Sequence, residues 1–277
     1  DPNSFGASII YALPIVAAVW QSGIGGRLGK VALTGYVGLS SLCILLTGSR
    51  GSLVGLGVWF AIIVWGTRYR TLAALALAIA APLAFIALPE SLQTRFETIV
   101  NPEVGPRNAQ ESGEGRIVGF LTGLELWAAN PLTGVGPGVW RPATGSAIES
   151  HNLYGQIMGE TGTAGVVSFL AIIGCYWANL RAVKRIRKAL PGQENDLVFT
   201  LPRAIGVAVF LLLFMGAAGH NLFRFTWLWF GGFLIIARHC AARRLAAWEP
   251  EPEWEEEAEI ELDSHEVPEG WVLHPAH

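Results

Sequence analysis

The sequence predicts an all-α fold, a polytopic membrane bundle of about seven helical spans that carries one long polar loop. Two observations lead to this prediction. Of the 277 residues, 52% are hydrophobic and only 15% are charged, whereas a soluble domain carries about a quarter charged residues. The hydrophobic residues also gather in runs of about 20 residues, which is the length that a helix needs to cross a bilayer.

The predicted spans divide the chain into four parts. Residues 1–88 hold four spans, residues 89–162 form the polar loop, and residues 163–244 hold three spans with a basic connection. Residues 245–277 form an acidic tail, because Glu249 to Glu269 contains eleven acids and no Lys or Arg. The predicted spans are residues 5–20, 31–47, 52–66, 71–88, 163–180, 204–220 and 225–238.

The distribution of Lys and Arg predicts the orientation. Thirteen of them fall in one set of connections and six in the opposite set, and the richer set is expected to face the cytoplasm. The loop 89–162 then faces outward, and the acidic tail, which repels itself and cannot bury a core, is expected to be disordered in the cytoplasm. The outward set consists of Arg50, Arg95, Arg107, Arg116, Arg141 and Arg224.

Within the long loop, the pattern predicts a mobile segment followed by helices. Residues 101–115 are rich in Gly, Pro and polar residues, which is typical of a mobile segment. Apolar residues recur every three or four positions from Arg116 to Asn130, which indicates an amphipathic helix. A short helix is expected to begin near Ser150, whose hydroxyl would cap it. The glycines between residues 134 and 138 are interpreted as turn-formers.

The chain also lacks the patterns of several other protein classes. The spacing of its three cysteines fits neither a disulfide framework nor a zinc site. Apart from Arg238, which ends the last one, the predicted spans contain no Asp, Glu, Lys or Arg, whereas ion-coupled transporters place such residues at membrane depth. The charges instead lie at the outer surface, which favours chemistry on a lipid-linked substrate. The chain begins at Asp1 without Met, so we expect it to be the C-terminal part of a longer polytopic protein.

Two arginines are candidate phosphate ligands, because a guanidinium offers a charged planar fork of donors. Arg50 lies in a tight Gly-Ser-Arg-Gly-Ser turn, where it could instead cap the turn or reach the interface. Arg116 opens the amphipathic helix, where it could instead be solvated and paired with Glu111 or Glu114. Arg141 is a candidate sugar contact.

His151 is the candidate general base, because imidazole titrates near neutral pH and can accept the proton of a hydroxyl group. The plainer interpretation is a capping or interfacial histidine. Asn152 could orient the substrate, and Glu149 or Glu160 could hold the imidazole tautomer. For Glu160, the helix would need a kink at Gly155 or Gly159. His220 precedes Asn221 in a second His-Asn pair, and it is the alternative base or a wall of the same site.

In their order along the chain, these motifs make the sequence resemble the bacterial O-antigen ligase and polymerase superfamily. The resemblance covers most of residues 1–240. It is carried by Asp1-Pro2-Asn3, Gly48-Ser49-Arg50-Gly51, Arg116, Pro131 to Gly138, His151-Asn152 and Gly159-Glu160-Thr161-Gly162.

The resemblance implies a multi-pass enzyme of the bacterial inner membrane that takes a glycan from undecaprenyl diphosphate at the periplasmic face. The acceptor would be lipid A–core, another lipid-linked glycan or a protein hydroxyl. The resemblance also implies catalysis without cofactor, metal or nucleotide, and nucleic acid is not an expected partner. The family roles assign Arg50 and Arg116 to the diphosphate and His151 to the base. Two other classes remain open, a transporter or flippase for lipid-linked sugars and a non-catalytic scaffold of the cell envelope.

Overall fold

The structure, a computed structural model, describes residues 1–101 and 107–248, with the side chains of residues 107–114 left aside. Over these residues the chain is helical and contains no strand, so the predicted all-α class is confirmed. The acidic tail predicted from residue 249 onward lies outside the described residues. The helices are α1 Pro2–Ser22, α2 Gly26–Thr47, α3 Arg50–Gly66, α4 Arg70–Ile86, α5 Glu90–Glu97, α6 Arg107–Ala129, α7 Trp140–Thr144, α8 Leu153–Lys188, α9 Leu197–Gly216 and α10 Thr226–Ala246.

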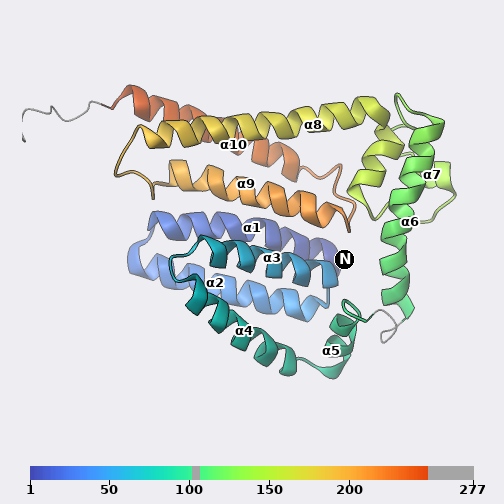
Figure 1. Cartoon of the computed structure of the whole chain (residues 1–277), viewed down its shortest axis with the longest axis horizontal. Coiled ribbons are helices and arrows are strands. Elements are labelled where there is room, and N and C mark those ends of the chain that lie inside the picture. Colours follow the sequence, from blue (N-terminus) through green and yellow to red (C-terminus); the bar gives the residue numbers. More distant parts are fainter. Residues whose placement is uncertain (102–106, 249–277) are drawn as a thin grey trace, which may run out of the picture.

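Helices α1 and α9 pack against each other at the centre of the bundle (Figure 1). Helices α8 and α10 cover one side of this pair, and α2 and α3 cover the other. Helix α9 serves both sides, because Ile205 and Leu212 pack toward α8 and α10 while Leu211 packs toward α1, α2 and α3. In a bilayer, such packing stabilises the bundle through van der Waals contact, since lipid is as apolar as leucine.

The seven predicted spans are not all confirmed. Among the described residues, four helices are long and apolar enough to cross a membrane, namely α1, α2, α8 and α9. Helices α3 and α4 are apolar but have 17 residues each, about 25 Å, against a hydrocarbon core of about 30 Å. Helix α10 has 21 residues, but its second half carries Arg238, Arg243 and Arg244.

The polar loop is more helical than predicted. Helix α6 begins at Arg107, so part of the segment expected to be mobile belongs to a 23-residue helix. Helix α8 begins at Leu153 and its cap is Asn152, not Ser150. Asn152 is the N-cap because its side-chain oxygen accepts hydrogen bonds from the N–H groups of both Tyr154 and Gly155, each at 3.0 Å.

Helix α8 changes direction at Gly162, not at Gly155 or Gly159. Gly162 has φ 60° and ψ −161°, a conformation that only glycine adopts readily. The kink interrupts the hydrogen bonds within the helix. The turn that follows α6 supplies substitute acceptors. The N–H groups of Thr163 and Ala164 donate to the carbonyls of Pro131 and Leu132, at 2.9 and 3.0 Å. The Pro131–Gly138 turn and the helix kink therefore stabilise each other.

Candidate functional site

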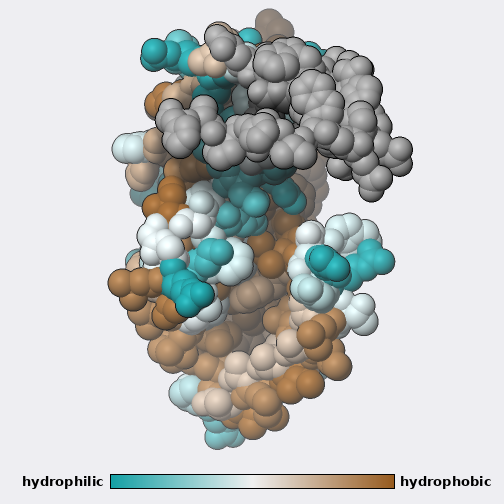
Figure 2. Space-filling model, turned by 90° about the vertical axis from the view of Figure 1, so that its left-hand side faces the viewer, coloured by the Kyte–Doolittle hydropathy of each residue, from teal (hydrophilic) through white to brown (hydrophobic). Residues whose placement is uncertain are grey.

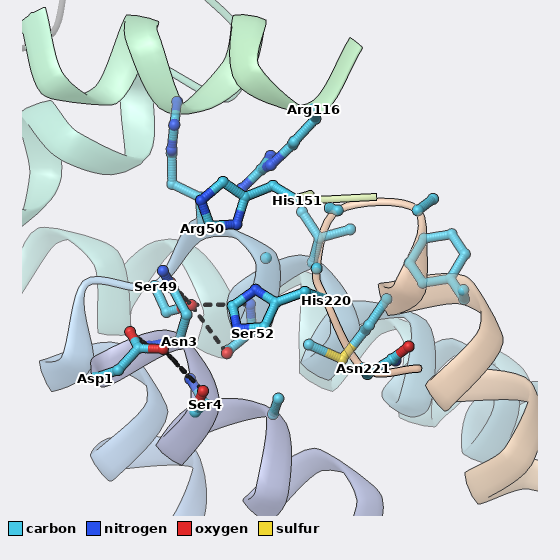
Figure 3. A pocket seen from close by; sticks show the side chains of 18 of the residues that line it. Asp1, Asn3, Ser4, Ser49, Arg50, Ser52, Arg116, His151, His220 and Asn221 are labelled. Atoms are coloured by element: carbon cyan, nitrogen blue, oxygen red, sulfur yellow. Dashed lines mark hydrogen bonds between the residues drawn. The ribbon is translucent and has the colours of Figure 1, made fainter. Parts of the chain in front are cut away.

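A cavity of about 1070 Å³ lies at the end of the bundle that holds the N-terminus of α1 together with α5 and α6 (Figures 1 and 3). Its walls come from the start of α1, the α2–α3 turn, α6, the residue His151 before α8 and the α9–α10 turn. Arg50, Arg116, His151 and His220 all line it. These four residues are far apart in the sequence, so only folding brings them into one cavity.

Arg50 is the first residue of α3, and the α2–α3 turn fixes its position. Gly48 ends α2 with φ 62°, and Ser49 caps α3 by accepting a hydrogen bond from the N–H of Ser52 at 3.3 Å. The Nη1 atom of Arg50 donates to the hydroxyl of Thr98 at 2.9 Å. This bond holds the guanidinium at the cavity wall, where Figure 3 shows it beside His151.

A network of hydroxyl and amide groups surrounds the cavity below Arg50 (Figure 3). The hydroxyl of Ser49 donates to Asn3 Oδ1 at 2.7 Å and lies 2.9 Å from the hydroxyl of Ser52. From the α9–α10 turn, Nη2 of Arg224 donates to the hydroxyl of Ser4 at 2.6 Å. The network ties the start of α1 to the starts of α3 and α10, and it adds Arg224 as a third guanidinium in the cavity.

Arg116 reaches the cavity because α6 and α8 cross in backbone contact. A Cβ atom on Gly123 would lie 2.2 Å from the carbonyl oxygen of Gly155, and one on Gly155 would lie 2.4 Å from that of Gly119. The two helices thus meet through glycines spaced four apart, at 119 and 123 on α6 and at 155 and 159 on α8, an arrangement that permits close approach. Arg116 lies one turn before Gly119, so the crossing places it beside His151.

His151 is held by its neighbour Asn152. Besides capping α8, Asn152 donates from Nδ2 to the carbonyl of Ala217 at 3.0 Å. This bond fastens the start of α8 to the α9–α10 turn, which carries His220. The imidazole rings of His151 and His220 have centroids 5.4 Å apart, and Figure 3 shows His220 next to His151 on the cavity wall.

The α9–α10 turn is fixed by Asn221. Its Nδ2 donates to the carbonyl of Leu212 at 2.8 Å, and the indole N–H of Trp227 donates to the carbonyl of Asn221 at 2.9 Å. The Nδ1 atom of His220 is buried and has no hydrogen-bond partner within the described part of the chain. His220 therefore keeps a polar atom available in a rigid turn.

The electrostatics of the cavity favour the neutral forms of its two histidines. Burial lowers the pKa of His151, and His220 and the positive charge of Arg116 lower the pKa further. Burial likewise lowers the pKa of His220, with the charge of Arg224 acting in the same direction. Burial and the charge of Arg50 lower the pKa of Arg116, but a guanidinium remains protonated in proteins. The cavity therefore combines fixed cations with imidazoles that are able to accept a proton.

Three residues predicted for the site lie outside this cavity. Arg141 pairs with Glu149 at 2.9 Å, and Asn152 uses its amide in the two contacts described above. Glu160 is fully buried, with 0% of its surface exposed. No hydrogen bond of the described residues joins His151 to Glu149 or Glu160, so neither carboxylate holds the imidazole tautomer in this structure.

Glu160 instead holds the turn that leads into α7. Its Oε2 accepts a hydrogen bond from the N–H of Gly138 and its Oε1 accepts one from the N–H of Trp140, both at 3.1 Å. Its carbonyl accepts from the N–H of Gly136 at 2.9 Å. Gly134, Gly136 and Gly138 have positive φ values, as expected of the turn-formers predicted from the sequence.

Replacing Glu160 by alanine should lower the stability of the folded protein by about 3 kcal/mol, because two hydrogen bonds are lost and the buried N–H of Trp140 is left without an acceptor. Thermal unfolding of the purified protein in detergent would measure this as a lower Tm. Glu125→Ala, which removes an exposed carboxylate from α6, is the matched control. Equal Tm values for the two variants would contradict the role of Glu160.

Asn3, Ser4 and Arg224 were not predicted to belong to the site, because they lie far in sequence from the polar loop. The glycine pairs at 119 and 123 and at 155 and 159 were not predicted to pack either. Their four-residue spacing is a visible signal, but it lies in the polar loop and outside the apolar runs where small-residue packing was expected. Arg224 was counted in the outward set of cations, and that set could have identified it.

The sequence was also compared with models of known protein families. Residues 35–170, which include Arg50, Arg116 and His151, match the family model described as O-antigen ligase. This match supports the O-antigen ligase and polymerase superfamily that the sequence motifs predicted. None of the curated proteins compared with the sequence matches it. The O-antigen ligase family implies a bacterial membrane enzyme of the glycosyltransferase type, with a lipid-linked glycan and a glycan acceptor as substrates.

The O-antigen ligase match stops at residue 170 and so leaves out part of the cavity. His220, Asn221 and Arg224 line the cavity from the α9–α10 turn, beyond the matched segment. Asp1, Asn3 and Ser4 line it from the start of α1, before the matched segment. The cavity therefore combines the matched segment with residues from both flanking parts of the chain.

Proposed function

We propose that the protein transfers a glycan from undecaprenyl diphosphate to an acceptor hydroxyl, as an O-antigen ligase or a polysaccharide polymerase. The observation that carries the proposal is the single cavity lined by Arg50, Arg116, His151 and His220. Lipid A–core, a lipid-linked glycan and a protein hydroxyl are the candidate acceptors.

The diphosphate is assigned to Arg50 and Arg116. Two guanidinium groups from different helices face one cavity, and each offers paired donors that match phosphate oxygens. Arg50 also stands at the N-terminus of the 17-residue helix α3, where the helix dipole favours a negative charge. These groups are in place before the reaction, so they stabilise the charge that develops on the leaving diphosphate.

The base is assigned to His151. In the proposed step, the acceptor oxygen attacks the anomeric carbon while its proton passes to His151. The bond between the anomeric carbon and the phosphate oxygen breaks, and the diphosphate leaves with the electron pair. The configuration at that carbon inverts. The lowered pKa of His151 supports this role, since a neutral imidazole is the form that accepts a proton.

The lipid part of the donor is assigned to the apolar side of the same cavity. Val54, Phe214 and Met215 line it and come from α3 and α9, two helices of the bundle. A polyprenyl chain that enters sideways between helices would pack against these side chains, while its diphosphate remains among the arginines. Under the orientation predicted from the Lys and Arg counts, this end of the bundle is periplasmic in the bacterial inner membrane.

Incubating the purified protein with a defined undecaprenyl-diphosphate glycan and each candidate acceptor tests the proposal. The expected result is a new glycosidic bond with inverted configuration, detected by mass spectrometry and NMR. Movement of the lipid-linked glycan across liposomes without a new bond would replace the proposal with a transporter. Absence of both activities, with envelope function retained after alanine replacement of Arg50, Arg116 and His151, would replace it with a scaffold.

A further inference from the structure

A second cavity, of about 680 Å³, lies between α1, α2, α3 and α9 at the opposite end of the bundle. It is lined by the C-terminal half of α3, whose N-terminus carries Arg50 at the first cavity. Figure 2 views the molecule from this opposite end and shows a hollow of hydrophobic residues with hydrophilic residues on both sides. The second cavity therefore lies apart from the cavity in which glycan transfer is proposed.

The mouth of the second cavity is positively charged. Arg68 and Arg203 line it, and no Asp or Glu is among its lining residues. The ammonium group of Lys30 lies 5.0 Å from the ring centroid of Trp20, another lining residue. Within the described part of the chain, neither Arg68 nor Arg203 has a hydrogen bond or an ion pair to a carboxylate. The mouth therefore presents cations without a protein counter-charge.

Arg203 is fixed by its helix. Arg203 was predicted to lie in a basic connection, but α9 begins at Leu197, so Arg203 lies in the second turn of the helix. A Cβ atom on Gly66 would lie 3.8 Å from Nη2 of Arg203, which places the guanidinium at the C-terminal end of α3. Arg68 follows two residues after Gly66, so two guanidiniums from different elements flank the same opening.

The interior of the second cavity is mostly apolar, and it contains one donor without an acceptor. Trp59 lines it and is 3% exposed, and its indole N–H has no acceptor within the described residues. A buried N–H without an acceptor costs free energy, so a ligand that supplies an oxygen there would gain affinity. Trp59 precedes Gly66 by seven residues, which is about 10 Å deeper along the helix axis.

We propose that this cavity binds an anionic glycerophospholipid of the surrounding membrane. Its phosphate lies between Arg68 and Arg203, an ester carbonyl accepts from the indole N–H of Trp59, and an acyl chain packs against α1 and α2. A phospholipid has these groups in this order, with the charge at the mouth, ester oxygens below it and hydrocarbon beneath. Basic pockets between membrane helices favour such head groups.

Lipid retention measured by native mass spectrometry tests the site. The purified protein is exchanged into mixed micelles that contain equal amounts of phosphatidylglycerol and phosphatidylcholine. The wild type is expected to retain phosphatidylglycerol in preference, and Arg68→Gln with Arg203→Gln should lower the preference roughly thirtyfold. Trp59→Phe, which keeps the ring and the charges but removes the N–H, should lower retention of both phospholipids.

The matched control is Arg70→Gln with Arg243→Gln, which removes the same charge from the same end of the molecule but outside the cavity. An equal loss in the two double variants would show general electrostatic attraction and overturn the site. Equal retention of the two phospholipids by the wild type would also overturn it, as would displacement of the lipid by inorganic phosphate. Circular dichroism of each variant confirms that the bundle is folded, and Trp59→Phe tests the site without any change of charge.

Discussion

Replacing His151 by alanine is expected to reduce glycan transfer by a factor of about 10² to 10⁴, the usual contribution of a general base. The acceptor hydroxyl would then have to lose its proton to solvent as its oxygen attacks. His151 makes no hydrogen bond among the described residues, so its removal leaves the network around Asn152 and Asn221 in place. Transfer from a defined lipid-linked donor, measured as initial rates, checks the prediction.

His239→Ala is the matched control, because His239 lies on α10 and outside both cavities. Near-normal transfer by the His151 variant would reject the base assignment. In that case His220→Ala becomes the decisive variant, since its ring is the other imidazole in the cavity. A strong loss in His220→Ala alone would transfer the role of base to His220.

The pH dependence of transfer provides a second test of the same role. A base accepts a proton only when neutral, so activity should fall as the pH decreases through the pKa of His151. Burial, His220 and Arg116 lower that pKa, and the fall should therefore occur below the ordinary value of 6.5. Removing the second ring by His220→Asn should shift the fall to higher pH. If activity falls at the same pH in His220→Asn as in the wild type, the two rings are not electrostatically coupled.

Replacing Arg50 by lysine is expected to reduce transfer by roughly a hundredfold, although the charge is kept. An ammonium group is a compact point charge and cannot reproduce the planar fork that matches phosphate oxygens. The hydrogen bond from Arg50 to Thr98 would also be lost, and with it the fixed direction of the side chain. Initial rates at saturating acceptor, with the donor concentration varied, would show the loss.

Two controls separate geometry from charge in this prediction. Arg70→Lys makes the same chemical change at the start of α4, outside the first cavity, and should leave transfer unchanged. Because Arg50→Lys conserves charge, its activity should fall at the same pH as the activity of the wild type. Wild-type rates in Arg50→Lys would mean that only the charge matters and would contradict a fork-shaped diphosphate ligand.

The sequence was informative about properties that repeat locally. Runs of apolar residues predicted the helices, and the order of the motifs around Arg50, Arg116 and His151 pointed to the O-antigen ligase family. The number of spans was less predictable, because α3 and α4 are short and α10 mixes apolar and basic residues. Hydropathy along a chain measures composition, and it does not measure how a helix is placed in a bilayer.

The roles of individual side chains within the site could not be predicted from the sequence. Asn152 and Glu160 have the chemistry of substrate ligands, yet the structure uses both to satisfy backbone groups around α8. For Glu160 the deciding feature was the kink at Gly162, because the backbone groups around it pair with a distant turn. Such pairing depends on three-dimensional position, and residue type alone does not show it.

By itself, the sequence determined a helical membrane chain whose reactive side chains lie in loops and at helix ends. Tertiary structure decided which of these side chains share a cavity. Glycines on α6 and α8 let two backbones touch and bring Arg116 beside His151, and Asn152 draws His151 toward His220. The physical reason is that helical periodicity follows from neighbours along the chain, whereas close approach depends on atoms that are distant in sequence and meet only after folding.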